Sequence, residues 1–339
     1  MIVDLRSDTV TKPTTEMLEA MMQAKVGDDV YGEDETVTVL EHKLAELFGK
    51  EAGLFCPSGT MTNQIAVKCF TNPMDEVIMD EKSHVYRYEG GGIAFNSSAS
   101  VCLLNGERGI LTPELIEPNI NPENVHNPVS SLVVLENTVN RGGGNYYSLS
   151  QIEPIYHLCK LKNLKLHLDG ARLFNALTET KEDTKRYGHF FDGISICLSK
   201  GLGAPVGSVL LGSKETIAKA RRIRKVLGGG MRQAGFLAAA GIYALDHHIT
   251  RLSKDHLHAK ILASALSEMS YVTNIVPVHT NIILFELDSK HNEEEFVSKA
   301  SHLGIKCASF GKRMIRFVTH LDITATMVDY TIENLRKIH

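Results

Sequence analysis

Short apolar runs alternate with helix-length segments from about residue 50 to residue 212. Several runs are rich in Val, Ile and Leu without polar alternation, which is typical of strands that are covered on both faces. One helix is expected to begin at Ser58 or Thr60, and another takes Ser150 as its N-cap. This alternation predicts an α/β fold with a mainly parallel sheet. The expected strands are 53–56, 77–79, 131–135, 164–168, 194–198 and 208–211.

The pattern changes after residue 213. Residues 214–226 and 233–269 have helical character, and the glycines at 228–230 separate them. The last ninety or so residues predict strands at 280–287 and 314–318, a helix at 293–303 and a final helix. We therefore expect a large domain over residues 1–249 and a small C-terminal α+β domain over residues 250–339.

Composition excludes several classes of protein. The 339 residues carry a formal net charge of -4, so we expect no nucleic-acid partner and no anionic-membrane partner. Charges within the first eight residues argue against a secretory signal, and the uncharged run 233–245 is too short to span a bilayer. The six cysteines form no C-x-x-C pair, so we expect reduced thiols, no metal site and a cytoplasmic location.

Three residues near two predicted strand ends carry the most informative chemistry. Asp169 follows the run 164–168, Arg172 comes three residues later, and Lys200 follows the run 194–198. Ligands of open α/β sheets bind beyond the carboxyl ends of strands. A lysine there can form an imine with an aldehyde, and a carboxylate can keep a pyridine nitrogen protonated. The set predicts pyridoxal phosphate, although Asp169 alone could be a helix cap and Lys200 a solvated turn residue.

Further candidates surround this set. Ser58, Gly59 and Thr60 open a helix after a strand, which suits a phosphate, although simple capping would also explain them. His84 follows the strand that ends near Asp80 and could stack on a pyridine ring or move protons. A capping or core role is its alternative. Glu89 could contact His84 or a water molecule.

An arginine and a serine suit a substrate carboxylate, and two further basic residues suit a phosphate. Arg316 is flanked by apolar residues, and a planar guanidinium binds a carboxylate through two hydrogen bonds. A structural ion pair is its alternative. Ser7 could add a hydroxyl or serve as an N-terminal cap. Lys225 and Arg232 could reach a phosphate within or across a subunit boundary, or belong to a solvated basic face.

Taken in order, these motifs resemble those of the low-specificity threonine aldolases, which have the aspartate-aminotransferase fold of the fold-type I pyridoxal-phosphate enzymes. Two positions depart from the family pattern and concern recognition of the substrate side chain. Val139 stands where the family usually has histidine, and the residues after His126 also differ. The resemblance covers residues 4–11, 27–34, 57–63, 135–138, 167–172, 199–207, 227–239 and 316–322.

The resemblance implies a role for each matching residue. Lys200 carries the cofactor, Asp169 holds its ring nitrogen, Gly59 and Thr60 hold its phosphate, and His84 stacks on the ring. Arg172 contacts the phenolic oxygen of the cofactor and, with Ser7 and Arg316, binds the substrate carboxylate. His126 touches the substrate hydroxyl. Tyr31, Lys225 and Arg232 complete the site of a neighbouring subunit, which implies a homo-oligomer, a dimer of dimers forming a homotetramer.

The expected reaction is cleavage of L-threonine or L-allo-threonine, a β-hydroxy amino acid, to glycine and acetaldehyde. His84 or His126 takes the proton of the β-hydroxyl group, since an imidazole titrates near the working pH. Serine hydroxymethyl transfer, β-elimination and transamination are the alternatives, because a fold does not choose among them. A non-catalytic module would have lost the lysine or its carboxylate partner, and this chain keeps both.

Overall fold

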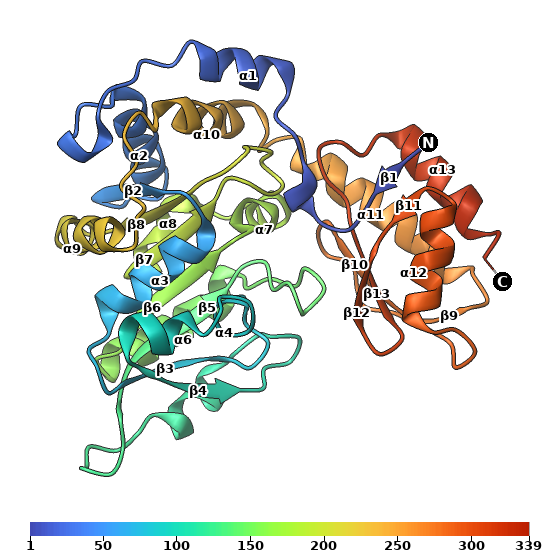
Figure 1. The fold of residues 1–339 in the computed structure, drawn as a ribbon. Coiled ribbons are helices and arrows are strands. Elements are labelled where there is room, and N and C mark those ends of the chain that lie inside the picture. The colour runs from blue at the N-terminus through green and yellow to red at the C-terminus, as the bar shows by residue number, and fades with distance from the viewer. Residues whose placement is uncertain (339) are drawn as a thin grey trace.

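A seven-stranded sheet forms the centre of the larger part of the molecule in this computed structural model, which describes residues 1–338 (Figure 1). Strand β8 runs antiparallel to both of its neighbours, and the other neighbouring pairs are parallel. The predicted α/β class with a mainly parallel sheet is confirmed. The order across the sheet is β2 (Ala52–Cys56), β8 (Ser208–Gly212), β7 (Gly193–Cys197), β6 (Lys165–Gly170), β5 (Val129–Glu136), β3 (Asp75–Asp80) and β4 (Ser100–Leu104).

Helices cover both faces of this sheet. Leu54 and Leu210 share a core with α3 (Gly59–Phe70) and α9 (Lys214–Val226). Their strand neighbours Phe55 and Val209 belong to the core that contains α2 (Glu35–Leu47) and α10 (Gly235–His247). Because successive side chains of a strand point to opposite faces, apolar runs without polar alternation are what two covered faces require. The other helices of this part are α1 (Thr15–Met22), α4 (His84–Arg87), α5 (Pro113–Ile116), α6 (Leu149–Leu161), α7 (Leu173–Thr180) and α8 (Thr184–Phe190).

Two helix predictions were wrong in detail. The N-cap of α6 is Ser148, whose backbone N–H donates to Oε1 of Gln151 at 2.9 Å, and Ser150 lies inside the helix. The stretch 233–269 is two helices, because the chain turns after His248 before α11 (Leu252–Ser267) begins. A ring nitrogen of His248 lies 2.7 Å from the carbonyl oxygen of Leu202 at this turn.

The C-terminal part forms a separate small α+β body with its own core. Strand β1 (Val3–Asp4) pairs in parallel with β11 (Ile305–Lys306), so the first residues of the chain pack here (Figure 1). The small α+β body is confirmed, while the division at residue 249 stays a prediction and residue 339 lies outside the described range. Its antiparallel sheet has the order β12 (Ala308–Gly311), β13 (Met314–Val318), β10 (Ile282–Leu287) and β9 (Val272–Ile275), with helices α11, α12 (Glu293–His302) and α13 (Ala325–Leu335).

Two predictions from composition can be compared with the structure. Among residues 1–338, no helix combines the length and the apolar composition that crossing a bilayer requires. All six cysteines are free, and four of them are buried, as expected of reduced thiols in a core. The buried ones are Cys56, Cys159, Cys197 and Cys307.

Candidate active site

The carboxyl ends of the parallel strands gather most of the predicted site residues. Asp169 lies near the end of β6, and Lys200 follows β7. Helix α3 follows β2, and the loop after β3 leads to His84 at the start of α4. We call the cavity of about 140 Å³ between these elements the inner compartment. The predicted residues that line it are Ser58, Gly59, Thr60, His84, Glu89, Asp169 and Lys200.

Asp169 has one satisfied and one unsatisfied carboxylate oxygen. Its Oδ1 accepts the backbone N–H of Ala171 at 3.1 Å, and the residue is only 2% exposed. Its Oδ2 is buried and has no hydrogen-bond partner within residues 1–338. Such orphaned oxygens are rare in folded proteins, and a charged N–H from a ligand would complete this one. The N-cap of the following helix is Arg172, so the view of Asp169 as only a helix cap was wrong.

Lys200 supplies the complementary amine. It lines the inner compartment and also the larger one beside it, and it is half-buried. Its ammonium group has no hydrogen-bond or ion-pair partner among the residues that the structure describes. An amine held at the junction of two cavities and left without a partner suits covalent work on a ligand better than structural work.

The start of α3 offers an anion site to the inner compartment. The side chain of Ser58 accepts the N–H of Met61 at 3.2 Å, so its capping role is real. The first N–H groups of a helix have no intrahelical partner, and those of Gly59 and Thr60 open this 12-residue helix. A Cβ built on Gly59 would meet no protein atom within 4 Å, so the space beside it lies open to a ligand.

His84 is held by a network of buried polar groups. Its Nδ1 lies 3.1 Å from Oε1 of Glu89, and Glu89 accepts from Nδ2 of Asn63 at 2.9 Å and Nε2 of Gln64 at 2.7 Å. Burial acts to lower the pKa of His84, but the hydrogen bond to Glu89 and the charge of Asp169 outweigh it, so this pKa is raised. Sequence reasoning missed Asn63 and Gln64, although their position one turn after Gly59 on α3 was a signal.

The same groups have a spacing that suits a metal ion. Ligand atoms of His84, Glu89 and Asp169 lie within 4.8 Å of one another. His84 and Glu89 are already hydrogen bonded to each other, so a metal would have to replace that contact. An organic cation that pairs with Asp169 alone requires no such change.

Arg316 lines a second cavity of about 390 Å³, which we call the outer compartment. Its Nη1 donates to Oδ1 of Asn140 at 2.9 Å and its Nη2 to the carbonyl oxygen of Arg6 at 2.8 Å, while its buried Nε has no partner within residues 1–338. No carboxylate of the described residues pairs with this guanidinium, so the alternative of a structural ion pair was wrong. Burial, aided by the nearby charge of Arg172, lowers the pKa of Arg316 to about 10.

Arg172 and Ser7 also line the outer compartment. Nε and Nη2 of Arg172 each donate to a carboxylate oxygen of Asp8 at 2.7 Å. Burial alone would raise the pKa of Asp8, but Arg172 holds it at about 2. Ser7 accepts the N–H of Thr9 at 3.2 Å, so its capping role is real, and its side chain still faces the compartment. Sequence reasoning did not single out Asp8.

Four predicted residues lie outside both compartments of this single chain. His126 is exposed in the loop before β5, and Tyr31 is 76% exposed. Lys225 is exposed near the end of α9, and Arg232 pairs with Asp28 at 2.9 Å. Their roles in binding stay predictions.

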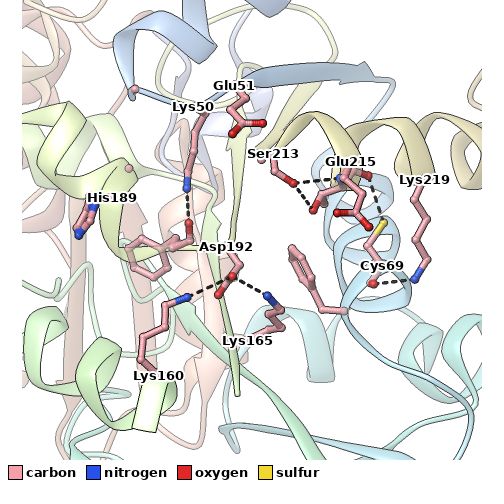
Figure 2. Close-up of a pocket in the computed structure, with 16 residues that line it drawn as sticks. Lys50, Glu51, Cys69, Lys160, Lys165, His189, Asp192, Ser213, Glu215 and Lys219 are labelled. Atoms are coloured by element: carbon pink, nitrogen blue, oxygen red, sulfur yellow. Dashed lines mark hydrogen bonds and ion pairs between the residues drawn. The ribbon is translucent and has the colours of Figure 1, made fainter. Parts of the chain in front are cut away.

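A larger cavity of about 590 Å³ lies at the opposite, amino end of the sheet (Figure 2). Figure 2 shows Asp192 between Lys160 and Lys165, with Nζ to Oδ1 distances of 3.5 and 3.1 Å. Lys50 donates to the carbonyl oxygen of Phe191, and Lys219 donates to that of Cys69 at 2.8 Å. Each of its lysines therefore has a partner in the protein.

Known proteins are similar to this chain in sequence and in fold. Residues 4–290 match the family described as beta-eliminating lyase. The chain is 42% identical to a probable low-specificity L-threonine aldolase 2 of Arabidopsis thaliana, over 99% of this chain and 97% of that protein. It is 40% identical to the low specificity L-threonine aldolase of Escherichia coli (strain K12), over 95% of each. A Leishmania major threonine aldolase structure, 22% identical, has the same fold with a TM-score of 0.85 over 98% of both chains.

Proposed function

Because this chain belongs to the low-specificity L-threonine aldolases, within the family of beta-eliminating lyases, we propose that it cleaves L-threonine and L-allo-threonine to glycine and acetaldehyde. The cofactor is pyridoxal 5'-phosphate. The proposal rests on one observation: among the residues that the structure describes, the amine of Lys200 and a buried carboxylate oxygen of Asp169 face the inner compartment without a partner.

The residues of the inner compartment fit this cofactor. When bound, it supplies an aldehyde that reacts with amines and a ring that accepts electrons from the breaking Cα–Cβ bond. Oδ2 of Asp169 would pair with the ring nitrogen and keep it protonated, which would give this orphaned oxygen a partner. The N–H groups of Gly59 and Thr60 would hold the phosphate, and His84 would contact the ring.

The outer compartment orients the amino-acid substrate. Arg316 has no carboxylate partner within residues 1–338, so it is free to bind the substrate carboxylate through paired hydrogen bonds, with Ser7 and Arg172 beside it. Holding the carboxylate fixes the direction of the Cα–Cβ bond relative to the ring. His84 lines both compartments, which supports it as the group that takes the β-hydroxyl proton, and His126 is the second candidate.

The assembly and location are part of the same proposal. The chain forms a homotetramer, a dimer of dimers, in which Tyr31, Lys225 and Arg232 contribute to a neighbour's site. The exposure of Tyr31 and Lys225 supports this, because neither side chain has a role in its own subunit's compartments. The protein works in the cytoplasm.

The product profile tests the reaction. Holoenzyme incubated with L-threonine or L-allo-threonine should release acetaldehyde and glycine in equal amounts, whereas L-alanine, which lacks the β-hydroxyl group, should give none. Faster turnover of L-serine, or release of ammonia in place of aldehyde, would favour the hydroxymethyltransferase-like or β-eliminating alternatives. A colourless protein that takes up no pyridoxal phosphate, and in which borohydride labels no lysine, would refute the cofactor.

A further inference from the structure

Glu136 lies buried at the end of β5 and holds two separate segments of the chain. It is only 6% exposed. Its Oε2 accepts the backbone N–H of His84 at 2.8 Å, and its Oε1 accepts the backbone N–H of Asn140 at 2.9 Å. The strand register places Glu136 directly beside Asp169 on β6. One carboxylate therefore joins the start of α4 to the loop after β5.

The two segments lead to different compartments. His84 starts α4 and lines both compartments, whereas Asn140 lines the outer one. The side chain of Asn140 accepts a hydrogen bond from Nη1 of Arg316 at 2.9 Å. Moving Glu136 would therefore disturb the histidine beside the cofactor and the arginine that faces the substrate.

We propose that Glu136 is a positioning residue that sets His84 and the Asn140–Arg316 pair together, and so couples the two compartments. This inference depends on the proposed function. Each oxygen of Glu136 accepts one backbone N–H, so both positions require an acceptor. A glutamine has the same shape, but its NH₂ group would face one of the two N–H groups and leave that group unpaired in a buried place.

The holoenzyme with Glu136→Gln tests the proposal. We expect kcat/KM to fall by about tenfold or more, the usual consequence of leaving a buried donor unpaired. KM should rise because Arg316 loses its position, and the visible absorbance and circular dichroism bands of the cofactor should change because His84 moves. Asn140→Ala breaks only the outer connection, so it should raise KM while these bands stay as in the wild type.

A control distinguishes positioning from the general effect of replacing a partly buried glutamate by glutamine. Glu182 also accepts a backbone N–H, that of Leu149 at 2.7 Å, and lines neither compartment. Glu182→Gln should leave KM and the cofactor bands unchanged.

Two results would overturn the inference while the wild type still releases acetaldehyde. One is a folded Glu136→Gln holoenzyme that behaves like Glu182→Gln. The second result, which decides the matter if Glu136→Gln does not fold, is an unchanged KM in Asn140→Ala. An inactive wild type would instead refute the proposed function.

Discussion

The two ends of the central sheet carry polar cavities of opposite character. The cavity at the amino end is the larger, about 590 Å³, and its lysines contact Asp192 or backbone carbonyl oxygens (Figure 2). The two compartments at the carboxyl end are smaller, about 140 and 390 Å³. Within residues 1–338, Oδ2 of Asp169 has no partner there and Arg316 has no carboxylate partner. Polar groups without protein partners, and not the volume of the cavity, mark the candidate site.

The topology of the sheet explains why the two ends differ. At the carboxyl end, parallel strands deliver the residues that follow them to one place, and α3 directs the N–H groups of its first turn there. At the amino end, Asp192 directly precedes β7 and lies beside Lys165, the first residue of β6. The charges at that end therefore compensate one another within the protein.

Replacing Lys200 should have the largest effect on activity. Lys200→Ala removes the amine that we propose binds the cofactor, so we expect kcat to fall by more than about a thousandfold, as when a covalent catalyst is removed. Acetaldehyde release from L-allo-threonine measures it. Lys165→Ala, at the other end of the sheet, is the matched control and should retain nearly full activity. Equal losses in the two variants would remove the distinction between the two ends.

Replacing Arg316 should weaken substrate binding. Arg316→Lys keeps the charge but loses the planar pair of donors, so we expect KM to rise by about a hundredfold, the equivalent of two charged hydrogen bonds. The cofactor bands should not change, because Arg316 lines only the outer compartment. Steady-state kinetics and an absorbance spectrum check both points, and an unchanged KM would contradict the carboxylate role.

Replacing Glu89 should shift the pH dependence of the reaction. The hydrogen bond to Glu89 raises the pKa of His84 by favouring the protonated ring, so Glu89→Gln should lower that pKa. If neutral His84 is the base, the acidic limb of the kcat/KM profile then moves to lower pH. A shift to higher pH, or none, would contradict this role.

Replacing Lys50 at the amino end should change stability only. Burial lowers the pKa of Lys50 to about 8 in the folded protein, so the unfolded chain binds more protons between about pH 8 and its ordinary value of 10.5. The free energy of unfolding should therefore gain a contribution from Lys50 as pH rises through this window, and this contribution should be absent in Lys50→Met. Denaturant unfolding of both proteins at pH 7.5 and 10 measures the difference, and acetaldehyde release should be equal for both.

Much of the fold could be predicted because its signals are local. Apolar runs without alternation predicted six of the seven strands of the central sheet, and the edge strand β4 was missed because its residues are partly exposed. The positions of Asp169 and Lys200 after such runs predicted the inner compartment, since parallel strands bring their carboxyl ends together. The break at 248–251 was missed because no glycine or proline marks it.

The sequence by itself determined the strands, the order of the motifs and the amine–carboxylate pair of the inner compartment, because each depends on neighbours along the chain. Only the tertiary structure decided which charges have partners. Arg172 pairs with Asp8 from 164 positions away, and Arg316 contacts Asn140 from 176 positions away. No local periodicity encodes such contacts, because they form only when tertiary packing brings distant segments of the chain together.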